Sequence, residues 1–172
     1  FVENRTRHRY GSFLAATYQS LITSVDDDTL PNLAPQIDVT QVVDAPDGWG
    51  RLSLNGNAAH LTREAGTDYT RASATADWRT RWIAPGGVVV EPFALGRVDY
   101  YNLADLAVPA GQEDTDSFSR ALGLVGTEFS WPFYRPGEQV DWIVEPVLSL
   151  VAATDDPERD RILNEDTLST DL

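Results

Sequence analysis

The residues that most often carry out catalysis or bind metals are sparse in this chain. Its 172 residues include two histidines and no cysteine. His8 lies near one end, and His60 shares an alternation phase with Leu52 and Leu54, so neither is placed beside a nucleophile. The histidines and acidic residues do not follow the ligand spacing of a zinc site or an EF-hand. The sequence therefore predicts a protein that is not an enzyme, with no cofactor and no dedicated metal site.

Two carboxylates, Glu91 and Glu145, each stand between a valine and a proline. In both places the glutamate lies on the polar phase of a strand-like segment and the proline on the apolar phase. Proline cannot donate to a β-ladder, so each motif predicts a bulge or a local strand distortion. The glutamates could line a substrate path or pair with cations, and pairing is favoured because buried charges in barrels are commonly paired. The candidate cations are Arg71, Arg79, Arg81 and Arg97.

The chain is acidic, with a formal net charge of −14 at pH 7. The acid is concentrated between strand-like segments, at residues 26–28, 113–116 and 155–160. A nucleic-acid partner needs a basic stripe, so the charge argues against that class of partner. No apolar run reaches the roughly 18 residues of a membrane-spanning helix, but a β-barrel stays possible because its signal is alternation.

The clearest structural signal runs from Asp68 to Asn102. Up to residue 83 the odd positions are mostly polar and the even ones mostly small or aromatic, and the alternation resumes after a Pro-Gly-Gly turn at 85–87. Period two predicts strands with one wet and one apolar face, and the turn makes them a hairpin. Each arm has about 15 residues, against the usual 5–6, which favours strands that cross a bilayer and extend beyond it.

Further strands are predicted at residues 10–23, 35–43, 51–63, 116–133 and 139–154. Tight turns at 46–50, 85–87 and 135–138 alternate with mostly longer and more acidic loops at 24–34, 64–67, 103–115 and from 155. Such alternation is typical of a bacterial outer-membrane barrel, whose short turns are periplasmic. The predicted fold class is all-β, an antiparallel up-and-down meander of about seven long strands without an amphipathic helix.

Aromatic residues separate towards the two ends of the predicted strands. The tryptophans lie towards the tight turns, whereas Tyr69, Tyr100, Tyr101 and Phe118 lie towards the long loops. Rings at both interfaces form the girdles of a membrane barrel, whereas a soluble sandwich more often buries tryptophan in mid-strand. This favours a membrane barrel over a soluble β-sandwich binding module. A small self-contained outer-membrane barrel of about eight strands also fits the length.

Several segments occur in an order and spacing that resemble one known family. They are SWPFYR at 130–135, VEPVLSLVA at 144–152 and NED at 164–166, preceded by the run from Gly50 to Arg71 with Asn55, Gly66 and LTR at 61–63. Together they resemble the LptD family of lipopolysaccharide-assembly outer-membrane proteins. The resemblance extends over most of the chain from about Tyr10.

The resemblance implies a segment of a very large barrel in the cell outer membrane that delivers lipopolysaccharide to the outer leaflet. It implies lipopolysaccharide, outer-membrane lipid, a plug lipoprotein and a periplasmic bridge protein as partners. Residues 1–172 are then expected to be one incomplete barrel segment, without the family's N-terminal β-jellyroll and the remaining strands.

Alternation also assigns the expected facing of individual side chains. Facing lipid are Ala72, Ala74, Ala76, Trp78, Val90, Ala94 and Val98. The candidates for lumen-facing residues are Arg71, Asp77, Arg79, Arg81, Glu91, Arg97, Asp99 and Glu145. The aromatic residues expected at the lipid interface are Trp49, Trp78, Trp82, Trp131, Trp142 and Tyr100.

Overall fold

The computed structural model describes residues 1–21, 27–46, 48–109 and 112–158. The predicted turn residue Asp47, the acidic residue Asp26 and the NED segment at 164–166 lie outside the described residues. Within the described part, no helix has the length and hydrophobicity needed to cross a membrane. The helical content there is a single 3-10 turn, Asp27–Thr29.

Almost all of the described chain is β-strand. The main sheet contains β1 (Val2–Arg5), β2 (Arg9–Ala16), β3 (Asn32–Asp44), β4 (Arg51–Thr62), β5 (Asp68–Arg79), β6 (Trp82–Ile83), β7 (Val89–Ala104), β8 (Asp116–Ser130) and β11 (Val147–Ala153). A separate pair is formed by β9 (Phe133–Arg135) and β10 (Trp142–Val144).

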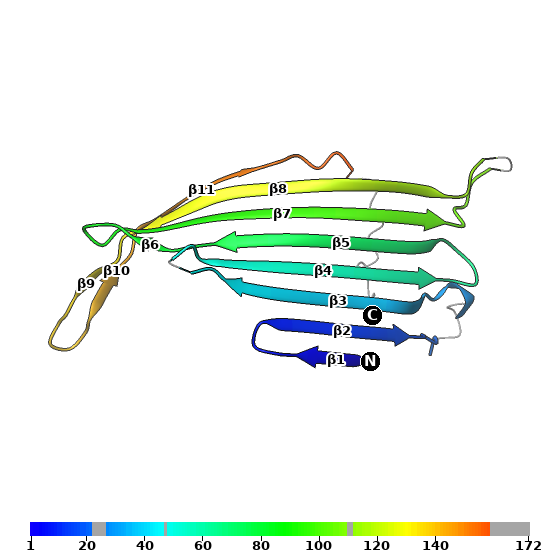
Figure 1. Ribbon diagram of the computed structural model, residues 1–172, viewed down its shortest axis with the longest axis horizontal. Helices are drawn as coiled ribbons and strands as arrows, with labels where there is room; N and C mark the ends of the chain where they lie inside the picture. Colours follow the sequence, from blue (N-terminus) through cyan, green and yellow to red (C-terminus); the bar gives the residue numbers. More distant parts are fainter. Residues whose placement is uncertain (22–26, 47, 110–111, 159–172) are drawn as a thin grey trace.

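The strands form an antiparallel meander in the order β1-β2-β3-β4-β5-β7-β8-β11, with β6 paired to β7. Figure 1 shows them as one curved layer, with the short turns at one end and the longer loops at the other. Seven of the described strands have seven or more residues. They are β2, β3, β4, β5, β7, β8 and β11. The predicted all-β class, the meander and the number of long strands are confirmed.

Strand boundaries differ from the sequence-based prediction at several places. The first predicted strand, 10–23, ends at Ala16, and a short strand at residues 2–5 precedes it. The β3 strand begins at Asn32 and shifts register between Leu33 and Gln36. Pro35 lies in that interval, where its missing N–H removes a ladder donor.

Each Val-Glu-Pro motif interrupts the strand opposite it. Pro92 faces Thr80, where β5 has ended, and pairing resumes at Trp82 without a change of register. Likewise β8 ends before Trp131, whose backbone N–H donates to the Pro146 carbonyl at 3.1 Å, and β9 and β10 continue the same register. Figure 1 shows that this β9–β10 hairpin bends away from the sheet. The motifs therefore cause strand interruptions, which confirms the predicted distortion in a form other than a bulge.

The buried core lies at the long-loop end of the sheet. Tyr69, Tyr101, Leu103 and Phe118 form one cluster, and Leu61 and Leu106 pack against it. The Tyr101 and Phe118 rings stack with centroids 4.8 Å apart, a geometry that adds to simple burial. Leu106 belongs to the segment after β7, so this segment folds back over the sheet.

The turn between β3 and β4 gives a matched test of tight packing. Gly48 and Gly50 both have positive φ, at 78° and 88°. A Cβ at Gly50 would lie 2.1 Å from the Arg79 carbonyl oxygen, whereas a Cβ at Gly48 would meet nothing within 4 Å. We expect Gly48→Ala to cost about 1 kcal/mol of folding free energy from backbone strain alone, and Gly50→Ala about twice that. Denaturant titration of the two full-length variants, followed by gel mobility of the folded form, measures the difference; equal costs would contradict the packing at Gly50.

Candidate functional site

Strand pairing sorts the side chains onto two faces. Residues directly opposite each other on neighbouring strands share a face. Ser73 is paired with Asn57 and Asp99, and Asp99 with Arg120. The face that carries these four residues is called the polar face below, and the reverse side is called the apolar face.

The apolar face exposes large hydrophobic side chains. Val98, Val125 and Leu148 are each more than half exposed. Its β5 residues Ala72, Ala74, Ala76 and Trp78 pair with residues such as Ala58, Leu54, Val98 and Ala94 on the same face. Single exposed apolar residues are normal on a soluble protein, but a continuous exposed apolar surface marks contact with a partner or a membrane.

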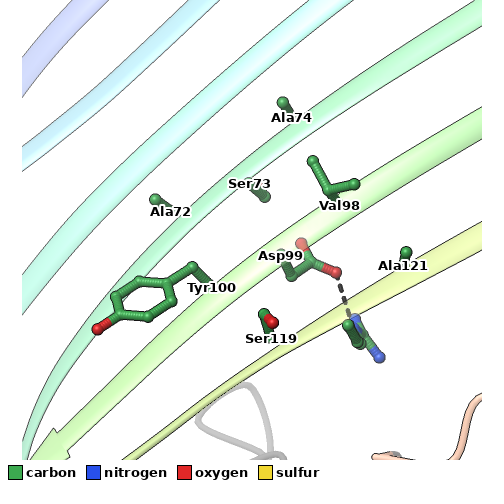
Figure 2. A pocket seen from close by; sticks show the side chains of 9 residues that line it. Ala72, Ser73, Ala74, Val98, Asp99, Tyr100, Ser119 and Ala121 are labelled. Carbon is green, nitrogen blue, oxygen red and sulfur yellow. Dashed lines mark hydrogen bonds and ion pairs between the residues drawn. The ribbon is translucent and has the colours of Figure 1, made fainter.

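A shallow hollow of about 610 Å³ lies over β5, β7 and β8. Figure 2 shows the small side chains of Ala72, Ala74 and Ala121 around it, beside the Tyr100 ring and Val98. By register these side chains belong to the apolar face. The dashed line in Figure 2 marks the hydrogen bond that Arg120 donates to Asp99. These two side chains belong to the polar face, on the other side of the sheet from the hollow.

Asp99 is the centre of a buried ion network on the polar face. Its carboxylate has no exposed surface and accepts hydrogen bonds from Arg97 Nε at 2.9 Å and Arg120 Nε at 2.7 Å. Arg120 also donates to Asp156 at 2.6 Å, and its guanidinium lies 5.7 Å from the Tyr101 ring centroid. The network connects β7, β8 and the segment after β11, so it fixes the position of that segment on the polar face.

The other predicted lumen-facing residues fall into three sets. Arg71, Asp77 and Arg79 share the polar face with Asp99, and Arg81 and Glu91 form an ion pair at 3.3 Å. This bears out the pairing interpretation for Glu91. Glu145 lies apart from them, exposed at the interruption between β10 and β11, and it makes no ion pair within the described residues. That any of these residues faces a barrel interior stays a prediction.

The five tryptophans all lie at the tight-turn end of the sheet. Trp49, Trp82 and Trp142 are more than half exposed. The indole N–H of Trp78 donates to the Trp49 carbonyl at 2.8 Å, and that of Trp131 to the Gly86 carbonyl at 2.9 Å. These rings thus keep a satisfied polar end beside a large apolar surface, as interfacial tryptophans do.

The predicted ring of aromatic residues at the long-loop end is wrong for three of its four members. Tyr69, Tyr101 and Phe118 are buried in the core on the polar face, and only Tyr100 is on the apolar face, where it is half exposed. The physical reason is alternation, because Tyr69 and Arg71 are two residues apart on one strand and must share a face.

Sequence reasoning missed several residues that organise the polar face. Arg120 and Asp156 complete the Asp99 network, and Asp38 accepts hydrogen bonds from Ser12, Gln36 and Asn57. Alternation could have placed Asp38 and Asn57, which are both on polar phases. Arg120 gave no such signal, because Leu122 and Leu124 in its phase are as apolar as Val125 in the other.

The two histidines occupy separate positions. His60 Nδ1 lies 2.7 Å from Thr70 Oγ1 across β4 and β5, whereas His8 lies 3.9 Å from Asp44 at the opposite end of the strands. Within the described ranges there is no group of three or more histidine, cysteine or acidic residues that could hold a metal ion.

Comparison with known proteins gives one family. The family model for LptD, described as LPS transport system D, matches residues 1–172. No curated protein and no solved structure matches the chain significantly. The LptD family is an outer-membrane family that transports and assembles lipopolysaccharide, and it is not known as a family of enzymes. Because the family model matches the whole chain, and because its long-stranded all-β meander suits a barrel wall, the chain belongs to the LptD family.

Proposed function

We propose that this chain forms part of the wall of an outer-membrane barrel that delivers lipopolysaccharide and inserts it into the outer leaflet. The apolar face contacts outer-membrane lipid, and the polar face lines the interior along which lipopolysaccharide moves. Residues 1–172 are one continuous segment of that wall.

The observation that carries this proposal is the exposure of the apolar face. Val98, Val125, Leu148 and Leu150 are each more than half exposed, and no second layer covers them among the residues that the structure describes. In water such a face would lose the free energy of burial that stabilises a domain. In a bilayer the same side chains are in their preferred solvent, and the long strands are sufficient to cross it.

The rival proposals are less well supported. A soluble β-sandwich requires two packed sheets, whereas the described strands form one extended layer and a small hairpin. In a small self-contained barrel β1 would pair with β11, but these are the two ends of the described sheet.

The two ends of the strands support an orientation of the barrel wall in the outer membrane, and the family resemblance supports a set of partners. The tryptophans mark the tight-turn end, which we place on the periplasmic side, and the acidic loops at the other end then face the cell exterior. A plug lipoprotein inside the barrel and a periplasmic bridge protein delivering substrate are the partners proposed from the family resemblance.

The proposal predicts the behaviour of the full-length protein in cells. Depletion of the protein should reduce newly made lipopolysaccharide at the surface, and the parent gene should restore it. A variant lacking residues 51–104, which removes β4, β5, β6 and β7 and opens the wall, should not. Surface lipopolysaccharide is measured by modification with an external enzyme, and the protein should leave the membrane only with detergent. Release of the parent protein by salt alone would contradict the membrane location.

A further inference from the structure

The apolar face carries few charged side chains, and these lie near the ends of the strands. Among the paired residues of the described strands, register places Arg9 and Asp68 on this face. Arg135 joins them, because β9 continues the register of β8, in which Phe129 is on the apolar face. The two arginines lie beside tight turns, whereas Asp68 lies at the long-loop end. On a face that contacts lipid, a charged side chain is stable among headgroups and costly in hydrocarbon.

Arg9 keeps most of its hydrogen-bonding capacity free. Its Nε donates to the side-chain oxygen of Gln41, a neutral partner on the next strand. Its terminal guanidinium nitrogens make no hydrogen bond or ion pair with the described residues. Asp44, the acidic residue at this end of β3, is on the polar face and pairs with Arg51 at 2.8 Å. Arg9 is therefore an exposed cation without a counter-ion on its own side of the described sheet.

Arg135 is in the same situation on the β9–β10 hairpin. It is exposed, lies directly opposite Trp142, and makes no ion pair with a described residue. Asp141, on the same hairpin, accepts hydrogen bonds from the Tyr134 hydroxyl at 3.0 Å and the Gly137 backbone N–H at 3.1 Å. An unpaired arginine beside an exposed indole suits a membrane–water interface, where the charge reaches water and the ring stays in the apolar layer.

The two arginines occupy the same position relative to the tight turns. Arg9 is the first residue of β2 and Arg135 the last of β9, so each adjoins the turn of its hairpin. Figure 1 shows these turns displaced stepwise from the β1–β2 hairpin to the β9–β10 hairpin. Strands tilted to a barrel axis produce such a stagger, so turns at one end can lie in one membrane plane. Trp49 and Trp82 are exposed at the turns between them.

We propose that Arg9 and Arg135 bind the phosphate groups of anionic phospholipids in the periplasmic leaflet of the membrane. The inference rests on the proposed function, which places the apolar face in lipid and the tight turns on the periplasmic side. A guanidinium binds two phosphate oxygens at once in a planar, bidentate geometry. With a net charge of −14 the chain has no general attraction to an anionic surface, so local cations must supply any preference for anionic lipid.

Lipid binding by the purified full-length protein tests the inference. The protein in detergent is titrated with phosphatidylglycerol, or with phosphatidylethanolamine of the same acyl chains, and native mass spectrometry counts the lipids retained. The parent should retain phosphatidylglycerol in preference. Arg9→Gln and Arg135→Gln should each raise the dissociation constant of one phosphatidylglycerol about fivefold, and the double variant should weaken both. Equal retention of the two lipids by the parent would overturn the inference.

Arg5→Gln is the matched control for Arg9→Gln. Arg5 lies at the same end of the sheet, but it is opposite Tyr10 and therefore on the polar face. This control should leave the phosphatidylglycerol titration unchanged. Gel mobility of the folded form verifies that each variant is assembled. A loss in Arg5→Gln equal to that in Arg9→Gln would show a general effect of charge and refute binding at the lipid side.

Photo-crosslinking in cells distinguishes the possible occupants. A p-benzoylphenylalanine residue replaces Val43, which is exposed on the apolar face of β3, two residues from Gln41. We expect crosslinks to phospholipid. Crosslinks to lipopolysaccharide would overturn the inference, because the tight turns would then lie in the outer leaflet. Crosslinks to a protein in place of lipid would also overturn it, by assigning Arg9 to a protein interface.

The outcomes separate this inference from the proposed function. A parent protein that leaves the membrane only with detergent, but shows no preference for phosphatidylglycerol, would refute the inference and leave the proposed function standing. Release of the parent by salt alone would refute both.

Discussion

Replacing Asp99 with asparagine should destabilise the folded protein by about 3 kcal/mol, because it removes one of the two carboxylates that pair with the buried Arg120. The Arg120 side chain is 12% exposed and donates to Asp99 at 2.7 Å. Arg97 is 36% exposed, so it can turn towards water and should contribute less to the loss. Asp156 keeps one bond to Arg120, which places the expected cost at the lower end of the range of about 3–5 kcal/mol for a broken buried pair.

The measurement is a denaturant titration of the full-length protein in detergent, with the folded fraction read from gel mobility. Asp77→Asn is the matched control, since Asp77 lies on the polar face of β5 and makes no ion pair or side-chain hydrogen bond to the described residues. That control should change stability by less than about 0.5 kcal/mol. The paired replacement Asp99→Leu with Arg120→Leu should recover part of the loss, because it removes the two most buried charges and leaves only the more exposed Arg97 and Asp156 without those partners. An Asp99→Asn variant as stable as the control would show that the network does not stabilise this part of the sheet.

The alternation of β5 explains why so much of the architecture could be predicted. Between residues 72 and 78 each polar side chain has an apolar neighbour on either side, so one strand fixes both faces. Its partners then follow from register, because Ser73 can share a face only with Asn57 and Asp99 once the hairpins are set. The assignment of Asp77, Arg97 and Asp99 to one face needed no information beyond this.

The argument from alternation fails for a strand in which both sets of alternate residues are apolar. In β8 the phase of Arg120 contains Phe118 and Leu122, and the other contains Val125 and Phe129, so periodicity cannot assign a face. The structure resolves the ambiguity through pairing with β7, which places Arg120 opposite Asp99. Partners such as Asp156 come from a distant segment and depend on the tertiary fold.

The aromatic residues show a different limit. The position of these rings along the strands predicts a membrane interface for Tyr69 and Tyr101. The face of the sheet on which the rings lie was not considered, and the structure places both rings in the core. A large ring at the end of a strand can contact lipid or pack under a loop that folds back. Only the position of Leu106 against the cluster distinguishes these cases, and a loop's path is not encoded in strand alternation.

The proline motifs connect the sequence to local shape more directly. A proline in β7 ends the pairing of its neighbour at Arg79, and Pro146 stands where the sheet gives way to the bent β9–β10 hairpin. Both interruptions fall at the tight-turn end, near the tryptophans. The missing N–H of proline is sufficient to predict a break there, whereas the direction of the bend requires the structure.

An arginine at Ala74 should cost roughly 2–4 kcal/mol in the membrane, if the apolar face contacts lipid near mid-bilayer. Ala74 lies in the middle of β5, with Gly56 and Val98 as its direct neighbours, and none of these side chains can pair with a guanidinium. The charge would therefore stand in hydrocarbon or draw water into it. The cost is measured by denaturant titration of the full-length protein in lipid vesicles, and the folded level of the variant in cells should fall accordingly.

Thr75→Arg is the control on the next residue, which points to the polar face. Its neighbours there are Asn55 and Arg97. A new arginine at this position is therefore opposite one like charge, which adds to the cost expected for the control. Like charges directly opposite each other destabilise a sheet by up to about 1 kcal/mol, which is still less than the cost expected at Ala74. The two variants introduce the same side chain at adjacent positions of one strand, on opposite faces of the sheet. Equal losses at the two positions would show that the phase assigned to β5 is wrong, and with it the proposal that Asp77, Arg97 and Asp99 line the interior.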